Sequence, residues 1–320
     1  MKLVTFSLSS GDAPRLGALN EAVDAIVDLQ QVQRRTAGNA HPALSSMQDL
    51  IEGGCQALEL ARSCLTDARE AESYPHDEAN LLAPLPRPIQ IRDCLCFEEH
   101  LAGSLEAARR MTGQGPSDGQ LAMLHTFRQQ PIYYKANRFA VAGPETEVIW
   151  PDYSKVMDYE LEIGMVMGRT GCDISAEKAV DHIFGYTIFN DLSARDTQMA
   201  EMQGLLGPGK SKDFDSANIL GPCIVTADAF NPAGARMIAR INGETVSDGS
   251  SGDMYYSFGD LIAFISRHET LYAGEILGSG TVGEGCGLET GRFLASGDVL
   301  ELEVEGIGVL RNRIVTNSND

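Results

Sequence analysis

The sequence predicts an α+β fold that is rich in strands, with a mixed or antiparallel β core. From residue 131 onward, segments of strand composition dominate, and only short helical segments near 175–183 and 257–267 interrupt them. The chain contains 33 glycines, which suit many tight turns. Strands and helices do not alternate strictly, which argues against a doubly wound parallel sheet. The strands expected in this part lie at 132–135, 159–167, 185–190, 219–226, 237–242 and 299–305.

A polar stretch at 67–88 divides the chain into two predicted parts. It is acidic, contains four prolines and has little hydrophobic periodicity. Before it, strand candidates in the first 30 residues precede a helical segment at 45–65. After it, a strand at 89–97 leads into a helix at 98–111, and the composition of 112–120 predicts a loop. We therefore expect a small N-terminal α/β domain with its linker at 1–88 and a larger, strand-rich domain at 89–320.

The composition excludes several classes of partner. Of the 320 residues, 43% are hydrophobic and 22% are charged, as in ordinary soluble proteins. The 45 acidic residues outnumber the 25 basic ones, and the net charge of −20 would repel nucleic acids and anionic membranes. Seven cysteines without a regular pattern, and no recognisable export signal, predict reduced thiols and a cytoplasmic location.

Two glutamates in the segment 157–164 are the first candidates for a functional site. In a strand, Glu160 and Glu162 would share one face, opposite Tyr159, Leu161 and Ile163. Two buried carboxylates on one face repel each other unless a cation neutralises them. The alternative is a solvated outer face, and the pattern alone does not decide between the two. Oxygen ligands without a nearby histidine favour Mg²⁺, or Mn²⁺ or Ca²⁺, over zinc.

A second segment, 185–198, follows about thirty residues later. Its apolar strand ends in Asn190-Asp191, so Asp191 is a candidate third oxygen ligand, although these residues would equally suit the cap of a following helix. Arg195 and Gln198 would share a face of that helix. The sequence at 278–283 matches G-x-G-x-x-G, but the residues after it are unsuited to starting a helix, so we do not expect a dinucleotide site.

Taken together, these motifs resemble the fumarylacetoacetate hydrolase family. The resemblance covers residues 89–316. It rests on Asp158-Tyr159-Glu160-Leu161-Glu162, the segment from Asn190 to Gln198, Leu206-Gly207-Pro208 with Lys212 and Phe214, Gly221-Pro222, Asn242-Gly243, Gly278-x-Gly280-Thr281 and Gly297-Asp298. It implies a mixed β-roll around a metal site, commonly in a homodimer.

The resemblance also implies roles for individual residues. Glu160, Glu162 and Asp191 match the metal-binding carboxylates of the family, and Asp93 matches a fourth carboxylate of the fumarylacetoacetases proper. His100 matches the general base and Glu289 the carboxylate that orients it. The remaining matches are Arg195, Gln198 and Lys212 for the oxyanion and leaving group, and Arg109, Tyr134 and Thr281 for substrate binding.

The implied activity is hydrolysis of a C–C bond in a 1,3-diketo acid, of the acylpyruvate or fumarylacetoacetate type, in the catabolism of aromatic compounds. A hydratase, isomerase or decarboxylase acting on a related 2-oxo acid is the alternative, and a non-catalytic metal-binding relative is a third. Leu95 and Met202 replace two tyrosines of fumarylacetoacetases, and Gly103 replaces a glutamate of the decarboxylase-type members. We therefore expect oxaloacetate decarboxylation less than the other activities. The segment 112–130 is expected to be a loop that closes over the substrate.

Overall fold

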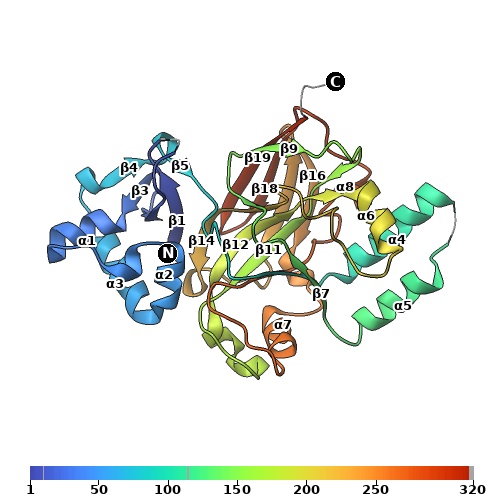
Figure 1. The fold of residues 1–320 in the computed structure, drawn as a ribbon, viewed down its shortest axis with the longest axis horizontal. Coiled ribbons are helices and arrows are strands. Elements are labelled where there is room, and N and C mark those ends of the chain that lie inside the picture. Colours follow the sequence, from blue (N-terminus) through green and yellow to red (C-terminus); the bar gives the residue numbers. More distant parts are fainter. Residues whose placement is uncertain (10, 114, 317–320) are drawn as a thin grey trace.

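The computed structural model of the protein describes residues 1–9, 11–113 and 115–316. Its main sheet has twelve strands in the order β4-β3-β2-β1-β14-β12-β11-β17-β6-β7, with β5 beside β1 and β8 beside β14 (Figure 1). Within this sheet, as far as the described residues show, only the pairs β17–β6 and β14–β8 are parallel. The strands of this sheet are β1 (Lys2–Ser7), β2 (Arg15–Leu19), β3 (Ala25–Asp28), β4 (Ser73–Pro75), β5 (Asn80–Leu81), β6 (Ile91–Leu95), β7 (Ile132–Ala136), β8 (Val141–Ala142), β11 (Leu161–Met167), β12 (Ile183–Asp191), β14 (Asn218–Thr226) and β17 (Ile276–Gly278).

A second sheet of five strands packs on one face of the main sheet. Alternate residues of β11, such as Leu161 and Ile163, join a hydrophobic cluster with Leu300 and Leu302 of this second sheet. Its order is β16 (Glu244–Ser250), β15 (Arg236–Ile241), β18 (Val299–Val304), β19 (Gly308–Thr316) and β9 (Glu147–Trp150). Because side chains alternate along a strand, the residues between them, including Glu162, point to the other face. A short pair, β10 (Met157–Asp158) and β13 (Ser193–Ala194), lies close to the chain at Glu160.

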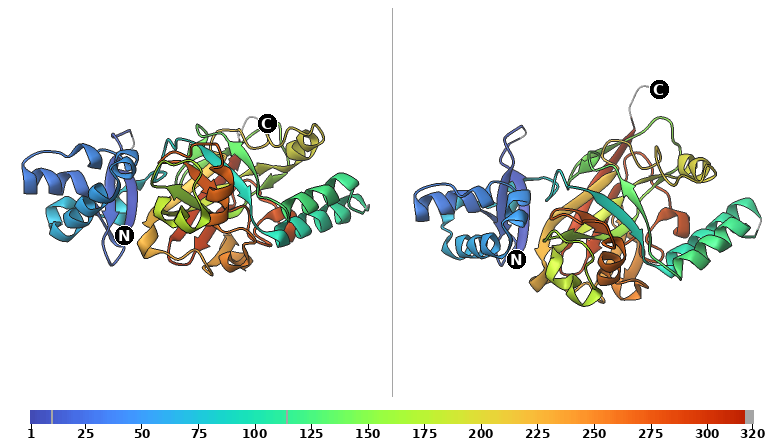
Figure 2. Two further views of the ribbon diagram at one scale, coloured as in Figure 1. Left: turned by 90° about the horizontal axis from the view of Figure 1, so that it is seen from below. Right: turned by 60° about the horizontal axis from the view of Figure 1, so that its bottom comes forward.

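The N-terminal residues extend the main sheet. β1 pairs antiparallel with β14, and Leu3 lies opposite Ile224. Leu3 also shares a hydrophobic cluster with Phe189 and Leu220 of the central strands. Helices α1 (Leu29–Ala37), α2 (Met47–Glu52) and α3 (Gly54–Asp67) lie at this end of the molecule (Figures 1 and 2). The division into domains at residue 88 remains a proposal, since strands from both sides of it form one sheet.

Residues 118–127 of the segment 112–130, which was expected to be a loop, form a helix, so this prediction is wrong for them; the described residues 113 and 115–117 are the loop between two helices, as the composition of 112–120 predicts. α4 (Glu98–Thr112) is followed by α5 (Asp118–Phe127), and the two helices project together from the sheets (Figure 2). Ser117 caps α5: its hydroxyl accepts a hydrogen bond from Gln120 N (3.3 Å), and the Gln120 side chain accepts one from Ser117 N (2.8 Å). This reciprocal capping box is a known helix start. Residues 114 and 317–320 of the predicted catalytic domain lie outside the described residues.

The remaining helices are short. They are α6 (Arg195–Met202), α7 (Phe258–Ile265) and α8 (Gly287–Thr290). The expected helical segment near 175–183 is a 3₁₀ helix, Ala176–His182. Among the described residues, no helix combines the length and the apolar character that crossing a membrane requires.

A buried ion pair fixes β6 against β17. Arg92 of β6 donates from Nε to Glu275 (3.0 Å) and from Nη2 to Glu269 (2.7 Å), and both Arg92 and Glu275 are buried. In the parallel register of these strands, Asp93 lies opposite Gly278. The ion pair therefore holds β6 at the position from which Asp93 enters the site described next.

Candidate active site

Four buried carboxylates meet at the centre of the main sheet. Asp93, Glu160, Glu162 and Asp191 each offer an oxygen within 4.8 Å of the others. Asp93 lies on β6, Glu162 on β11 and Asp191 at the end of β12, while Glu160 stands just before β11. None is more than 9% exposed, so the solvated-face alternative for Glu160 and Glu162 is wrong. The capping alternative for Asp191 is also wrong, because the N-cap of α6 is Ala194.

The glycine-rich segment after β17 makes room for these carboxylates. A Cβ atom on Gly278 would lie 2.5 Å from Asp93 Oδ1 and 2.8 Å from Glu162 Oε2, which is closer than real contacts allow. The backbone N–H of Gly280 donates a hydrogen bond to Glu162 Oε2 (3.1 Å). The chain then runs through a turn to α8, without the long helix that a dinucleotide site requires. The two glycines of the G-x-G pattern thus leave space for the carboxylates and donate a hydrogen bond to one of them.

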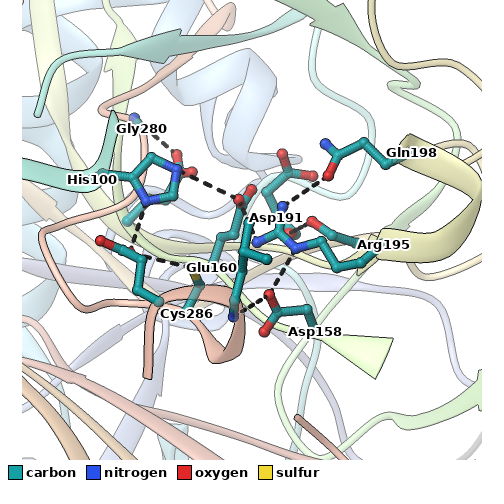
Figure 3. A network of polar contacts seen from close by, with 12 residues as sticks. His100, Asp158, Glu160, Asp191, Arg195, Gln198, Gly280 and Cys286 are labelled. Atoms are coloured by element: carbon teal, nitrogen blue, oxygen red, sulfur yellow. Dashed lines mark hydrogen bonds and ion pairs between the residues drawn. The ribbon is translucent and has the colours of Figure 1, made fainter. Parts of the chain in front are cut away.

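Two buried cations neutralise part of the cluster. Lys212 Nζ lies 2.6 Å from Glu160 Oε2 and 2.5 Å from Asp191 Oδ2, and Arg195 Nη2 lies 2.8 Å from Glu160 Oε1. Figure 3 shows Glu160 and Asp191 between His100 and Arg195. Burial alone would raise the pKa of Glu160, but the charges of Lys212 and Arg195 outweigh it and lower that pKa. Gln198 accepts a hydrogen bond from Arg195 Nη1 (2.9 Å).

Three carboxylate oxygens of the cluster are buried and have no hydrogen-bond partner: Asp93 Oδ1, Glu162 Oε1 and Asp191 Oδ1. Such oxygens are costly to bury unless something compensates them. Burial and the neighbouring carboxylates raise the pKa of Asp93 and of Glu162, and burial also raises that of Asp191 despite Lys212. A divalent cation would remove this cost. The cluster therefore fits a metal ion, and its all-oxygen composition suits a hard one.

The four predicted ligands differ in whether their carboxylate oxygens already have hydrogen-bond partners. The resemblance gave Asp93 as a fourth carboxylate, and Asp93 carries one of the three unpartnered oxygens. In contrast, both oxygens of Glu160 are already bound by Arg195 and Lys212. Asp93, Glu162 and Asp191 therefore offer unpartnered oxygens that could hold a metal ion, while Glu160 links the cluster to its cations.

A histidine–glutamate pair borders the cluster. His100, near the start of α4, lies with Nδ1 2.8 Å from Glu289 Oε2, and its Nε2 faces Glu160 Oε1 at 4.0 Å. The other Glu289 oxygen accepts a hydrogen bond from Glu284 N (3.1 Å). A Cβ on Gly103 would lie only 2.5 Å from Glu289 Oε1. The glycine that departs from the decarboxylase pattern therefore leaves the space that the Glu289 carboxylate fills.

Of the three predicted substrate-binding residues, Tyr134 and Thr281 lie at or near the carboxylate cluster, whereas Arg109 does not. The Tyr134 hydroxyl donates to Asp191 Oδ2 (2.6 Å), so Tyr134 joins the cluster. Thr281 is buried immediately after Gly280. Arg109 is exposed and pairs with Glu106 on the same helix (2.7 Å), and among the described residues no ion pair joins it to the cluster. The structure therefore does not bring Arg109 to the site.

Sequence reasoning missed Asp158, which is completely buried. Its Oδ2 accepts from Arg195 Nε (2.7 Å) and Leu288 N (2.9 Å), and its Oδ1 accepts from Gly287 N (2.6 Å). One carboxylate thus orients Arg195 and also caps α8, the helix that carries Glu289 (Figure 3). The feature of the sequence that could have identified Asp158 is its position as the first residue of the Asp158–Glu162 motif. Its partners at 287 and 288 lie too far along the chain for the sequence to reveal.

Comparison with known proteins identifies the family. A family model described as the fumarylacetoacetate (FAA) hydrolase C-terminal domain matches residues 95–315. The chain belongs to the fumarylacetoacetate hydrolase family. The resemblance deduced from the motifs is therefore confirmed, and the protein is an enzyme of this superfamily.

Members of the family with curated names cover nearly the whole chain. The mitochondrial oxaloacetate tautomerase Fahd2a of Rattus norvegicus is 31% identical over 319 residues, which span 98% of this chain and 92% of that protein. The oxaloacetate tautomerase YisK of Bacillus subtilis is 30% identical over 298 residues, covering 91% of this chain and 93% of its own length.

Solved structures of the family have the same fold. A fumarylacetoacetate hydrolase from Exiguobacterium antarcticum superposes with a TM-score of 0.75 at 27% identity, covering 99% of this chain and 100% of that one. Maleylpyruvate hydrolase from Sphingobium gives a TM-score of 0.71 at 22% identity over 99% of this chain and 100% of its own, and shows the likeness of fold alone. The predicted α+β class and mixed sheet are confirmed.

Replacing Glu162 with glutamine should lower the affinity for Mg²⁺ by at least about 10–100-fold, because the change removes charge from an unpartnered ligand oxygen. Calorimetric titration of the metal-free protein measures this affinity directly. Glu147→Gln, at an exposed glutamate of β9, is the control and should leave the affinity unchanged. An unaltered affinity in Glu162→Gln would remove Glu162 from the metal site.

Gly278→Ala should also weaken Mg²⁺ binding, by about 10-fold or more, since the new methyl group must displace the Asp93 or Glu162 carboxylate. The matched control is Gly115→Ala, where nothing lies within 4 Å of the added atom. Equal affinities in the two variants, measured by the same titration, would show that the cluster does not need the space at Gly278.

Asp158→Asn should lower the free energy of unfolding by up to about 3–5 kcal/mol, because the amide removes one of the two carboxylates that pair with the buried Arg195 and leaves only Glu160. Urea denaturation measures the change. Asp248→Asn alters a similar pair with Arg236 on the surface, and should cost no more than about 1 kcal/mol. If both variants lose the same small amount, Asp158 does not hold Arg195 in the way described.

Proposed function

We propose that the protein is a metal-dependent keto–enol tautomerase of a 2-oxo dicarboxylic acid of the oxaloacetate type. The observation that carries this proposal is the placement of one proton-transfer pair, His100 and Glu289, beside an acidic cluster suited to a metal ion. Tautomerisation requires one base and a stabilised enolate, and involves no second reactant. The tautomerase names of relatives that cover almost the whole chain support the same reaction.

His100 would move the proton. Glu289 accepts the Nδ1–H, which leaves the lone pair of the ring on Nε2 and fixes the orientation of the ring. Nε2 faces the cluster, where it would take a proton from carbon 3 of the keto acid and return one to form the other tautomer. The pair is buried, which limits exchange of that proton with water.

The buried cations would stabilise the negative charge that develops on the 2-oxo oxygen. Lys212 and Arg195 are held by Glu160, Asp191 and Asp158, so their positive charges are fixed before the reaction begins. A divalent ion, when bound by Asp93, Glu162 and Asp191, would polarise the carbonyl as a Lewis acid. We propose Mg²⁺ as this ion, with Mn²⁺ or Ca²⁺ as alternatives.

C–C bond hydrolysis of a 1,3-diketo acid, in aromatic catabolism, is the second candidate. The same pair would activate a water molecule, and Lys212 with Arg195 and Gln198 would stabilise the oxyanion. Likeness to a fumarylacetoacetate hydrolase at 27% identity favours it. Decarboxylation has less support, since Gly103 stands in the place of that group's glutamate. We also propose that the protein is a homodimer with a cytoplasmic location, as expected in the sequence analysis, whichever of the two reactions it catalyses.

An assay of enol-oxaloacetate and a panel of acylpyruvates, each with Mg²⁺, separates the two activities. The protein should speed the loss of enol absorbance of oxaloacetate beyond the rate with Mg²⁺ alone, without forming cleavage products from the acylpyruvates. Chelation should abolish the effect, and Mg²⁺ or Mn²⁺ should restore it. Cleavage of an acylpyruvate without tautomerase activity would establish the second candidate. If the protein catalyses neither reaction, both candidates are refuted.

Variants in the same assay test the roles of His100 and Glu289. His100→Asn should lower turnover by about 10²–10⁴-fold, Glu289→Gln should lower it less, and the double variant should be little worse than His100→Asn. His268→Asn is the matched control, because His268 is exposed and has a positive φ of 54°, which asparagine tolerates. Losses that multiply in the double variant would show that the two residues act separately.

A further inference from the structure

We propose that His100, Cys286 and Glu289 form a second metal site, which takes a borderline or soft ion of the Zn²⁺ class and thereby inactivates the proton-transfer pair. This goes beyond the proposed function, because it assigns to the same histidine a ligand that competes with catalysis. It also gives a role to Cys286, which tautomerisation leaves unused.

The three donor groups are already together. Glu289 Oε2 lies 2.8 Å from His100 Nδ1 and 3.2 Å from Cys286 Sγ, and the three ligand atoms all lie within 4.8 Å of one another. All three residues are buried, and Cys286 completely so. Imidazole nitrogen, thiolate sulfur and carboxylate oxygen are the ligands that Zn²⁺ combines in proteins. Three protein ligands also leave a fourth position open.

This donor set differs in kind from the carboxylate cluster beside it. Asp93, Glu162 and Asp191 offer only oxygen, which suits Mg²⁺, whereas a nitrogen and a sulfur donor favour ions later in the first transition row. The two sets have no residue in common. The two sites therefore differ in the donors they offer, and Mg²⁺ in large excess should occupy the first and leave the second available.

A cavity of about 500 Å³ lies beside the second site. It borders Glu289 and the segment 282–284 that leads to Cys286. Its walls carry Arg110 and a larger number of acidic side chains, Glu99, Glu106, Asp248, Asp253 and Glu284, so the net negative potential of this cavity would attract a divalent cation and repel the dicarboxylate substrate.

Binding would follow a balanced exchange. The ion takes the place of the thiol proton of Cys286, which is released to solvent, and coordinates Nδ1 of His100 while the ring's single proton moves to Nε2. That nitrogen then carries a hydrogen where the reaction requires a lone pair. The bound ion thus removes the base without displacing the ion of the carboxylate cluster.

Cobalt(II) tests the site without relying on activity. It substitutes for Zn²⁺, and a cobalt–thiolate bond gives a charge-transfer band in the near ultraviolet that oxygen ligands do not produce. With Mg²⁺ in large excess, Co²⁺ added to the whole protein should produce this band, and Zn²⁺ should abolish it. Cys286→Ser should lose the band. Cys172→Ser, at an exposed cysteine, should keep it.

Two results of this titration would overturn the proposal: no thiolate band in the wild-type protein, or a band that persists in Cys286→Ser. If that variant does not fold, His100→Asn replaces it and should weaken Co²⁺ binding at least about 10–100-fold. An unchanged affinity in His100→Asn would equally contradict the site.

Inhibition provides the second readout and rests on the proposed function. In saturating Mg²⁺, Zn²⁺ should inhibit the tautomerase, and the inhibition constant of Cys286→Ser, measured against its own uninhibited rate, should be at least about 10–100-fold higher. Equal constants in the wild type and Cys286→Ser would contradict the inhibitory role. If the protein has no tautomerase activity, the proposed function fails, and the cobalt spectrum still decides the metal site.

Discussion

The mutual repulsion of four buried carboxylates is the constraint on which the rest of the site depends. Two unit charges about 4 Å apart repel by about 4 kcal/mol in an environment of intermediate polarity. The main sheet nevertheless brings Asp93, Glu160, Glu162 and Asp191 within 4.8 Å of one another. Lys212 and Arg195 compensate only part of this charge, and three oxygens remain without partners. A cluster of this kind is suited to a further cation.

A chain of contacts connects the carboxylate cluster to the His100–Glu289 pair. Glu160 holds Arg195, Arg195 is held in turn by Asp158, and Asp158 caps the short helix that carries Glu289. Glu289 orients His100, whose other nitrogen faces Glu160 again. These contacts therefore form a ring that begins and ends at Glu160. A change in the charge of the cluster would affect His100 both through Glu289 and through Glu160. This arrangement suits a reaction in which the base acts on a substrate that the cluster holds.

Much of this could be predicted from local pattern, and the rest required long-range contacts. Two-residue periodicity placed Glu160 and Glu162 on one face, and the motifs identified the family. Local pattern could not show that Arg195 and Lys212 occupy both oxygens of Glu160, because these contacts span 35 and 52 residues. The prediction of a loop at 112–130 failed because it relied on the glycine and proline content and overlooked the capping box that begins at Ser117. β19 was missed although its residues alternate between buried and exposed.

Anomalous diffraction from crystals of the protein grown with Mn²⁺ tests the central claim most directly, because it locates the ion without reference to any reaction. The account predicts one strong peak per chain, in contact with carboxylate oxygens of Asp93, Glu162 and Asp191, with Lys212 and Arg195 still paired to Glu160. Absence of a peak at the cluster, or a peak only at other residues, would contradict it, since the buried negative charge would then be stable without a metal ion.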